Sequence, residues 1–398
     1  MTFERTAQAM PFMDLAAQRR RIGARMDQAI ARVLEHGRFV LGPEVEQLER
    51  RLEAFSGARH CITCANGTDA LILALIARSI GPGDAVLVPA FTFVATAEAV
   101  ARVGATPVMV DVEADSFNID ASRLLRAITV ARAKQLRPRA VIAVDLFGQP
   151  ADYDALRQFA ADNAMTLIAD AAQSFGASRG GRKVGTLAEI TTTSFYPSKP
   201  LGCYGDGGAI FTDDDDLAER LRSLGCHGRT GTGRDHGLVG MNSRLDSIQA
   251  AVLIEKLEVF QPEIHARNAF ANAYSSALEG VVRCPQIAGK VTSVWAQYTV
   301  VVDDGRDALV RDCNAAGVPT AIHYAEPLHA LSAYRDFPRA SDELPVAAWL
   351  SCHVVSLPMH ADLSEADQSR VTEAVVAAVR RAKRRKKDAL DPQPALPD

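Results

Sequence analysis

The stretch TTTSFYPSKPLG, residues 191–202, joins a strand to an irregular segment that holds a single lysine. Its β-branched beginning is typical of a buried strand. Pro197 and Pro200 then end the strand, because proline has no amide donor, and they place Lys199 near the strand's carboxyl end. A lysine between two prolines is also compatible with an ordinary exposed loop charge. Whether Lys199 has a chemical role therefore depends on the residues at the neighbouring strand ends.

Short apolar runs of the same kind alternate with helical patterns along the first half of the chain. Apolar strands without interruption, each followed by a helix, are typical of a mainly parallel sheet that helices cover on both faces. We therefore predict an α/β fold. The predicted strands are 61–64, 85–88, 106–110, 140–144, 166–169, 191–194 and 209–211, and the predicted helices are 69–79, 94–103, 120–128, 151–163 and 213–224.

The length of the chain and the patterns outside this sheet predict further domains and segments. A chain of 398 residues is too long for one typical core, so we expect two domains. Helical spacing occupies residues 12–36, a segment that begins at Pro43, and a long stretch from Leu245 to about Tyr274. The predicted parts are an N-terminal helical segment (1–50), a large domain (51–260), a smaller C-terminal α+β domain (261–379) and a basic, proline-containing tail (380–398). The predicted elements of the smaller domain are strands near Val281, at 297–302 and at 319–324, a helix at 305–315 and a closing helix that begins after Leu363.

Composition and charge exclude several classes of protein. The chain is 48% hydrophobic and 23% charged, as in soluble globular proteins. No apolar run reaches the length of a membrane span, and residues 1–25 lack the apolar core of a signal peptide, so we predict a cytoplasmic protein. The net charge is −4 although residues 380–387 carry seven positive charges, so the body of the chain is acidic and offers no broad basic face for nucleic acid.

The basic segment at 380–387 is interpreted as the solvated end of the last helix, which then runs into proline-rich disorder at 391–394. Contact with anionic lipid or RNA is the alternative. Seven cysteines, an odd number, favour free thiols over a disulfide framework. Cys61 and Cys64 form a CxxC pair without a second pair or a histidine cluster at ligand spacing. We therefore interpret both as residues packed beside a strand end, and we predict no metal site.

Three chemical features lie at predicted carboxyl ends of strands, where open parallel sheets bind ligands. Residues 65–70 (ANGTDA) join a strand to a helix, so free amides, the helix dipole and the Thr68 hydroxyl favour an anion. Asp170 follows another strand, where a carboxylate needs a partner such as an arginine or a protonated ring nitrogen. Lys199 is the third feature, because an amine in a desolvated site loses its proton and becomes a Schiff-base nucleophile.

This set is the one expected for pyridoxal phosphate (PLP). The phosphate would bind the helix N-terminus, the pyridinium nitrogen would contact Asp170, and the aldehyde would react with Lys199. Phe93 follows another strand end and is a candidate for stacking on the ring, with core packing as the alternative. A simple helix cap is the alternative explanation for Asn66 and Thr68.

These residues resemble the DegT/DnrJ/EryC1/StrS family, the nucleotide-sugar aminotransferases of PLP fold type I. The resemblance extends from about Met13 to Val379 and implies that residues 51–260 bind the cofactor. Residues 64–71 and 197–208 are similar to bacterial 3-aminotransferases that act on UDP-linked 2-acetamido-3-keto sugars for O-antigen synthesis. The motifs that carry the resemblance are 42–45, 65–70, 170–176, 194–202, 205–208 and 242–246.

The resemblance implies a role for each candidate residue. Lys199 forms the Schiff base, Asp170 contacts the pyridine nitrogen, and Gln173 lies near the ring hydroxyl. Phe93 stacks on the ring. The phosphate is held by Gly67, Thr68, Ser194 and, from the neighbouring subunit of a homodimer, Asn242. The candidates for contact with the nucleotide sugar, also across the interface, are Arg244, His323 and Tyr324.

The implied reaction has two halves, in which Lys199 moves the protons. Glutamate gives its amino group and leaves pyridoxamine phosphate (PMP), which then aminates UDP-2-acetamido-2-deoxy-3-keto-glucuronate. The alternatives are UDP-3-keto-GlcNAc, the route to a lipid A diamino sugar, a dTDP-linked keto sugar, and a non-catalytic regulatory or binding protein. Related sugar dehydratases have histidine in place of the lysine, so Lys199 argues against that class. The resemblance assigns no role to the basic tail, and family members differ in the loop at 228–240.

Overall fold

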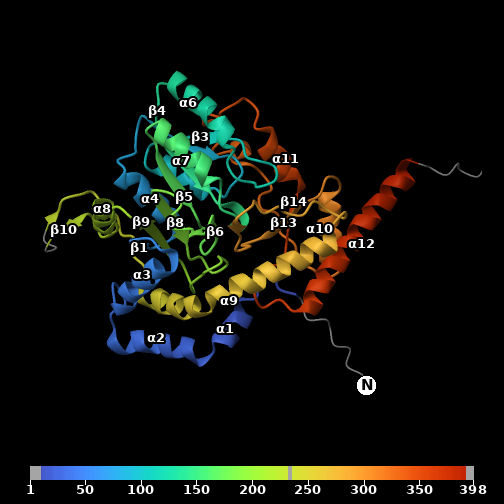
Figure 1. Cartoon of the computed structure of the whole chain (residues 1–398), viewed down its shortest axis with the longest axis horizontal. Coiled ribbons are helices and arrows are strands. Elements are labelled where there is room, and N and C mark those ends of the chain that lie inside the picture. The colour runs from blue at the N-terminus through green and yellow to red at the C-terminus, as the bar shows by residue number, and fades with distance from the viewer. Residues whose placement is uncertain (1–9, 232–234, 391–398) are drawn as a thin grey trace, which may run out of the picture.

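The computed structural model describes residues 10–231 and 235–390, and a seven-stranded sheet lies at its centre (Figure 1). The strand order is β1-β9-β8-β5-β4-β2-β3. The neighbours from β8 to β3 pair in parallel, whereas β9 is antiparallel to both β1 and β8. The predicted, mainly parallel α/β sheet is therefore confirmed. Its strands are β1 (His60–Cys64), β2 (Asp84–Pro89), β3 (Thr106–Val110), β4 (Arg137–Val144), β5 (Thr166–Asp170), β8 (Ile190–Ser194) and β9 (Gly208–Thr212).

Helices cover both faces of this sheet. Successive side chains of a strand point to opposite faces, so Val86 and Val88 join one apolar cluster while Leu87 joins the other. The first cluster packs against α4 (Gly67–Ala77), α5 (Ala95–Arg102), α8 (Asp215–Gly225) and α11 (Pro345–His353). The second packs against α3 (Pro43–Ser56), α6 (Leu124–Ala133), α7 (Tyr153–Asp162) and α9 (Ser247–Leu278). The strands are buried on both sides, which explains why their sequences are apolar without alternation.

The long helix α9 connects this body to the C-terminal elements (Figure 1). Its first half packs against α3 and α2, and its second half contacts α12. A third apolar cluster combines Tyr274 of α9 with residues of the C-terminal elements. The remaining helices are α1 (Leu15–Ile22), α2 (Ala24–His36), α10 (Arg306–Ala315) and α12 (Glu365–Leu390), with 3-10 turns η1 (Ala121–Arg123), η2 (Leu146–Gly148) and η3 (Leu328–Ala330). The short strands are β6 (Ser178–Arg179), β7 (Arg182–Lys183), β10 (Arg229–Thr230), β11 (Asp235–His236), β12 (Val291–Thr292), β13 (Tyr298–Val301) and β14 (Val354–Leu357).

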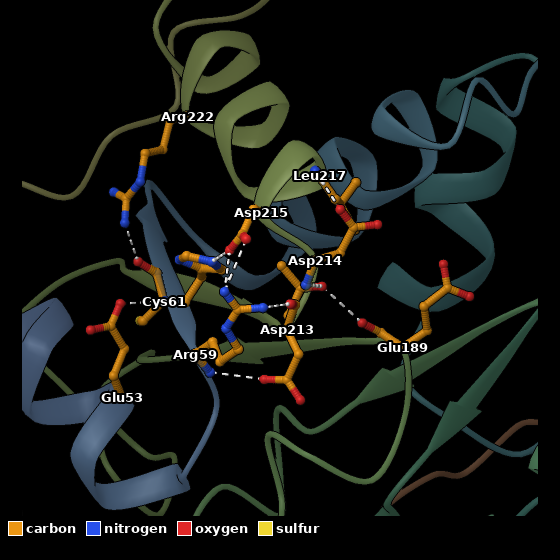
Figure 2. A network of polar contacts seen from close by, with 11 residues as sticks. Glu53, Arg59, Cys61, Glu189, Asp213, Asp214, Asp215, Leu217 and Arg222 are labelled. Carbon is orange, nitrogen blue, oxygen red and sulfur yellow. Dashed lines mark hydrogen bonds and ion pairs between the residues drawn. The ribbon is translucent and has the colours of Figure 1, made fainter.

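Cys61 of β1 belongs to a polar network that connects this strand to α3 and α8 (Figure 2). Its amide donates to Glu53 at 2.9 Å, and its carbonyl accepts from Arg222, also at 2.9 Å. Burial raises the pKa of the Cys61 thiol well above its ordinary value. Residues 10–231 and 235–390 contain no group of three His, Cys, Asp or Glu side chains that could hold a metal ion. Cys61 is fully buried in the apolar cluster that contains Leu87, and this burial supports a packing role.

Two predicted strands of the C-terminal part are wrong. Val281 lies in a turn that follows α9, and the adjacent pairing is limited to Arg283 with Val301. The segment 319–324 forms only an isolated bridge from Ala321 to Ser356, because Pro319 has no amide hydrogen to donate and the chain turns at 323–324.

The strand that pairs with β13 is β14, which the sequence analysis missed together with α11. The predicted helical stretch 12–36 also differs, since it divides into α1 and α2 at Gly23, whose φ of 63° breaks the helix.

The loop at 228–240 and the basic segment at 380–387, which have no assigned role, differ in structure. The loop at 228–240 contains the antiparallel pair β10 and β11, and its centre, 232–234, lies outside the described residues. The basic segment 380–387 continues α12, as predicted, and the predicted disorder at 391–394 lies outside the described residues. None of the helices in the described part of the chain is long and apolar enough to span a membrane.

Candidate active site

A cavity of about 510 Å³ lies at the carboxyl ends of the central strands. Its walls come from the last residues of β4, β5 and β8, from the loops and helix ends that follow β1, β2, β5 and β8, and from residues that precede β9, β13 and η3. Two predicted residues, Asn242 and Arg244, do not line it. The predicted site residues that line it are Gly67, Thr68, Phe93, Asp170, Gln173, Ser194, Lys199, His323 and Tyr324.

The N-terminus of α4 forms one end of the cavity. Asn66 caps the helix by accepting from the Asp69 amide at 2.8 Å, so the earlier amides are left for a ligand. Gly67 packs so tightly on β8 that a Cβ at this position would lie 2.6 Å from the Cβ of Ser194. The cap that Asn66 provides therefore leaves room for an anion at the same helix end. Gly67, Thr68 and Ser194 converge on a helix N-terminus suited to a phosphate.

Asp170 is buried at the end of β5 and faces the cavity. Its carboxylate accepts hydrogen bonds from the Thr96 hydroxyl and the Ala172 amide, both at 3.2 Å. Burial raises the pKa of Asp170, and these bonds and the charge of Lys199 oppose that rise. The charged side chain that acts on Asp170 is Lys199, and no arginine in the described part of the chain forms an ion pair with this carboxylate.

Lys199 reaches the cavity from the loop that follows β8. The loop is a tight turn, in which the Lys199 amide donates to the Tyr196 carbonyl at 2.8 Å. A Cβ on Gly202 would lie 2.5 Å from the Pro197 carbonyl, so this turn requires glycine. Burial lowers the pKa of the Lys199 amine, with the charge of Asp170 acting against it. A lowered pKa increases the fraction of neutral amine, which is the nucleophilic form.

Gln173 connects two walls of the cavity. Its Oε1 accepts from the Phe147 amide at 2.7 Å, and its Nε2 donates to the Tyr324 hydroxyl at 3.0 Å. The Nδ1 of His323 lies 2.9 Å from the Ser356 hydroxyl, and burial lowers the pKa of this histidine, as does the charge of Lys199. Phe93 is 51% exposed, with its ring centroid 6.1 Å from that of Tyr324. This exposure contradicts the core-packing alternative for Phe93.

Asn242 and Arg244 lie together outside this cavity. Asn242 is exposed and accepts a hydrogen bond from Arg244 at 2.6 Å. The sequence analysis missed other residues that line the cavity, namely Thr92, Thr96, Tyr196, Ser198, Asp206 and Gln297. Among these residues, only Thr92 and Thr96 could have been found from the sequence. They are two hydroxyl residues four positions apart, just after a predicted strand end.

The sequence pattern of the DegT/DnrJ/EryC1/StrS aminotransferase family matches residues 20–376. The chain belongs to this family. It is 48% identical to the UDP-2-acetamido-2-deoxy-3-oxo-D-glucuronate aminotransferase of Pseudomonas aeruginosa, over 89% of this chain and 96% of that protein. It superimposes on a DegT-family aminotransferase from Brucella abortus with a TM-score of 0.91 and 47% identity, over 92% of this chain and 99% of the other.

These matches confirm a PLP-dependent aminotransferase and the predicted DegT fold. A more distant structure, of a Streptococcus pneumoniae protein described as a sugar aminotransferase, is known in its PLP and PMP forms. It has a TM-score of 0.83 and 26% identity to this chain in the PLP form, over 90% of this chain and 96% of the other. The cavity fits the cofactor, since an anion cradle, a buried carboxylate and an amine of lowered pKa face one space. When bound, PLP supplies an aldehyde that accepts amino groups and a ring that acts as an electron sink.

Proposed function

We propose that this enzyme is a 3-aminotransferase that moves the amino group of glutamate to C3 of UDP-2-acetamido-2-deoxy-3-keto-glucuronate. The observation that carries this proposal is the 48% identity to the P. aeruginosa enzyme over 96% of its length. The product would be a 3-amino sugar for the O-antigen of lipopolysaccharide or for another surface polysaccharide. We place the reaction in the cytoplasm, and the free state of all seven cysteines suits a reducing compartment.

The chain's own residues have distinct tasks in this reaction. Lys199 would take the proton from Cα of the amino donor in the first half, and would return a proton to C3 of the sugar in the second half. Asp170 would hold the ring nitrogen of PLP in its protonated form. Gly67, Thr68 and Ser194 would bind the phosphate at the N-terminus of α4.

We further propose a homodimer in which each subunit completes the site of the other. Phe39, Val40 and Leu41 are each 47% exposed and form an apolar surface. An isolated bridge between Val40 and Asp246 places this surface beside the segment that holds Asn242 and Arg244. An apolar surface of this kind is suited to contact with a second copy.

Charge also supports a shared site. A UDP-uronate carries a diphosphate and a carboxylate, whereas the described lining of the cavity includes the acids Asp170 and Asp206 and the basic residues Lys199 and His323. Arg244 lies outside the cavity of its own chain. From a neighbouring subunit, its guanidinium would supply the missing positive charge, and Asn242 would reach the phosphate of PLP.

Other relatives define the alternative substrates. One is a dTDP-3-amino-3,4,6-trideoxy-α-D-glucose transaminase, and another is a UDP-N-acetyl-3-dehydro-α-D-glucosamine 3-aminotransferase. They are 40% and 37% identical to this chain, which is lower than the identity to the uronate enzyme. The decisive difference between the two UDP sugars is the C6 carboxylate.

The test is to convert the enzyme to its amino form with glutamate and then to offer matched keto sugars. These are the UDP-3-keto sugar with the C6 carboxylate, the same sugar with a C6 hydroxyl, and a dTDP-linked keto sugar, with aminated products measured by mass spectrometry. We expect kcat/KM for the uronate to be at least about tenfold higher, because a hydrogen bond to a charged group is worth about 1.5–3 kcal/mol. Equal or faster amination of the C6-hydroxyl sugar would contradict the proposed substrate. A failure of glutamate to change the cofactor's absorbance would contradict glutamate as the donor.

A further inference from the structure

A second buried carboxylate, Asp145, lies behind the cavity at the end of β4. Its Oδ1 accepts from the Ala151 amide at 2.9 Å and from the Tyr153 hydroxyl at 2.8 Å. Its Oδ2 accepts from the Ser174 hydroxyl at 2.7 Å. Burial raises the pKa of Asp145 to about 7, and these three hydrogen bonds oppose the rise. Three hydrogen-bond donors therefore surround one fully buried carboxylate. None of the roles proposed above for the active-site residues involves this carboxylate.

The two oxygens of Asp145 join the turns that follow β4 and β5. Oδ1 binds residue 151 and so closes the turn that contains Phe147, whose φ is 60°. A non-glycine residue rarely adopts this left-handed conformation unless its surroundings hold it there. Oδ2 holds Ser174, the residue that follows Gln173 in the turn after β5. One carboxylate thus fixes both partners of the hydrogen bond between the Phe147 amide and Gln173.

This arrangement determines which way the Gln173 amide points. The Phe147 amide is a donor, so the atom that faces it must be the carbonyl oxygen of Gln173. The side-chain NH2 group then points to the cavity, where one hydrogen goes to the Tyr324 hydroxyl. The other hydrogen is available for the ring hydroxyl of PLP, the group that Gln173 was predicted to contact.

We propose that Asp145 is a positioning residue for cofactor chemistry, which acts by fixing the Gln173 amide as a donor toward the ring oxygen of PLP. Asp145 does not line the cavity, and the path runs from its two oxygens through the two turns to Gln173. The proposal rests on the PLP cofactor and is independent of which sugar is aminated.

The test is a spectroscopic pH titration of the PLP-loaded enzyme, which does not depend on turnover. Loss of a donor makes the ring oxygen more basic, so the protonated cofactor persists to higher pH. For Asp145→Asn we expect the midpoint to rise by about one pH unit, since a hydrogen bond to a charged oxygen is worth about 1.5 kcal/mol or more. Asparagine keeps the shape of the side chain. Asn118 still binds the Leu146 amide and the Gln149 carbonyl, so the turn retains other support.

A double variant separates action through Gln173 from a general effect. Gln173→Ala is expected to raise the midpoint, and Asp145→Asn is expected to add nothing to it in the double variant. Additive shifts, or no shift in either single variant, would overturn the proposal. Ser174→Ala removes one of the three hydrogen bonds to Asp145, so we expect a smaller shift of the midpoint in the same direction. This variant replaces Asp145→Asn in the test if Asp145→Asn does not fold.

Asp84→Asn is the matched control. Asp84 is equally buried at the opposite end of the sheet, where it pairs with Arg137 at 2.9 Å. This variant is expected to lower the thermal unfolding midpoint and to leave the cofactor's titration unchanged. An equal spectral shift in Asp84→Asn would show a general loss of stability and overturn the role of Asp145. Normal titrations with no amination of any keto sugar would instead contradict the proposed substrate alone.

Discussion

Lys199 and Asp170 face the same cavity, and burial acts on their proton affinities in opposite directions. It lowers the pKa of the amine and raises that of the carboxyl group, and each charge partly offsets the shift of the other. Both shifts favour neutral side chains in the absence of a ligand. A protonated ring nitrogen next to Asp170 would favour the carboxylate again, while the neutral amine of Lys199 is the form that attacks an aldehyde.

Replacement of Lys199 by alanine is the direct test of this chemistry. We expect Lys199→Ala to lose the absorbance of the cofactor bound through its aldehyde, and to reduce transamination by at least about 10²–10⁴-fold, the usual contribution of a positioned proton-transfer group. Lys134→Ala, at an exposed lysine after α6, is the control and should behave as wild type. Turnover at the wild-type rate in Lys199→Ala would show that another amine performs the reaction.

The chemistry of the site was predictable where a polar residue directly follows a strand. Asp170 is the last residue of β5, and residues 66–68 come shortly after β1. The sheet brings these strand ends to one edge. Asp206 and Gln297 were not predictable in this way, because they reach the cavity from loops whose path no local pattern encodes. Asp145 was also missed, since its role depends on three donors that only the tertiary structure assembles.

At the scale of the elements, the strands of the central sheet agree with their predictions to within a few residues. Burial on both faces forces a continuous apolar run, which is a strong signal in a sequence. The sequence patterns that indicate strands are weaker in the C-terminal part. β14 has four residues, and Pro319 lies in a β-branched stretch that forms only one bridge. Short strands in a small sheet depend on their pairing partners more than on their own pattern.

The contact between α4 and β8 gives a prediction about cofactor affinity. In Gly67→Ala the new methyl group would meet Ser194 at 2.6 Å, so the helix N-terminus and the strand end must separate. Overpacking of this kind costs about 1–3 kcal/mol, so we expect PLP to bind about ten- to a hundredfold more weakly, measured by fluorescence titration of the apo enzyme. Gly289→Ala is the control, because a Cβ there meets nothing within 4 Å. Unchanged affinity in Gly67→Ala would argue against a phosphate at this helix end.

At the scale of the whole molecule, α9 crosses from the sheet to the third apolar cluster without a break. The division into domains at 51–260 and 261–379 stays a prediction, and its boundary lies inside this helix. The basic segment of α12 is partly paired, because Arg381 and Lys386 contact Asp312 and Asp304 of the neighbouring segment at 2.9 and 2.7 Å. Such exposed pairs contribute little to stability, which agrees with the interpretation of a solvated helix end.

The proposed sharing of sites between two subunits predicts complementation between inactive variants. Lys199→Ala removes the amine from a subunit's own cavity, and Asn242→Asp places a negative charge where we expect the phosphate of the neighbour's cofactor. Each homodimer is expected to be inactive. In a mixed dimer, the site that contains Lys199→Ala also receives Asn242→Asp from the other subunit, so it has both defects. The second site receives the native Lys199 and the native Asn242, so it has neither.

Random reassociation of equal amounts makes about half of the dimers mixed, and each has one intact site, so activity should return to about a quarter of wild type. The measurement is transamination by the two variants after joint refolding or co-expression, with dimers verified by analytical ultracentrifugation. If Asn242 served the cavity of its own chain, both sites of a mixed dimer would be defective and no activity would return. Mixing Lys199→Ala with Asp170→Asn is the negative control, because both residues line the same cavity of one chain and cannot complement.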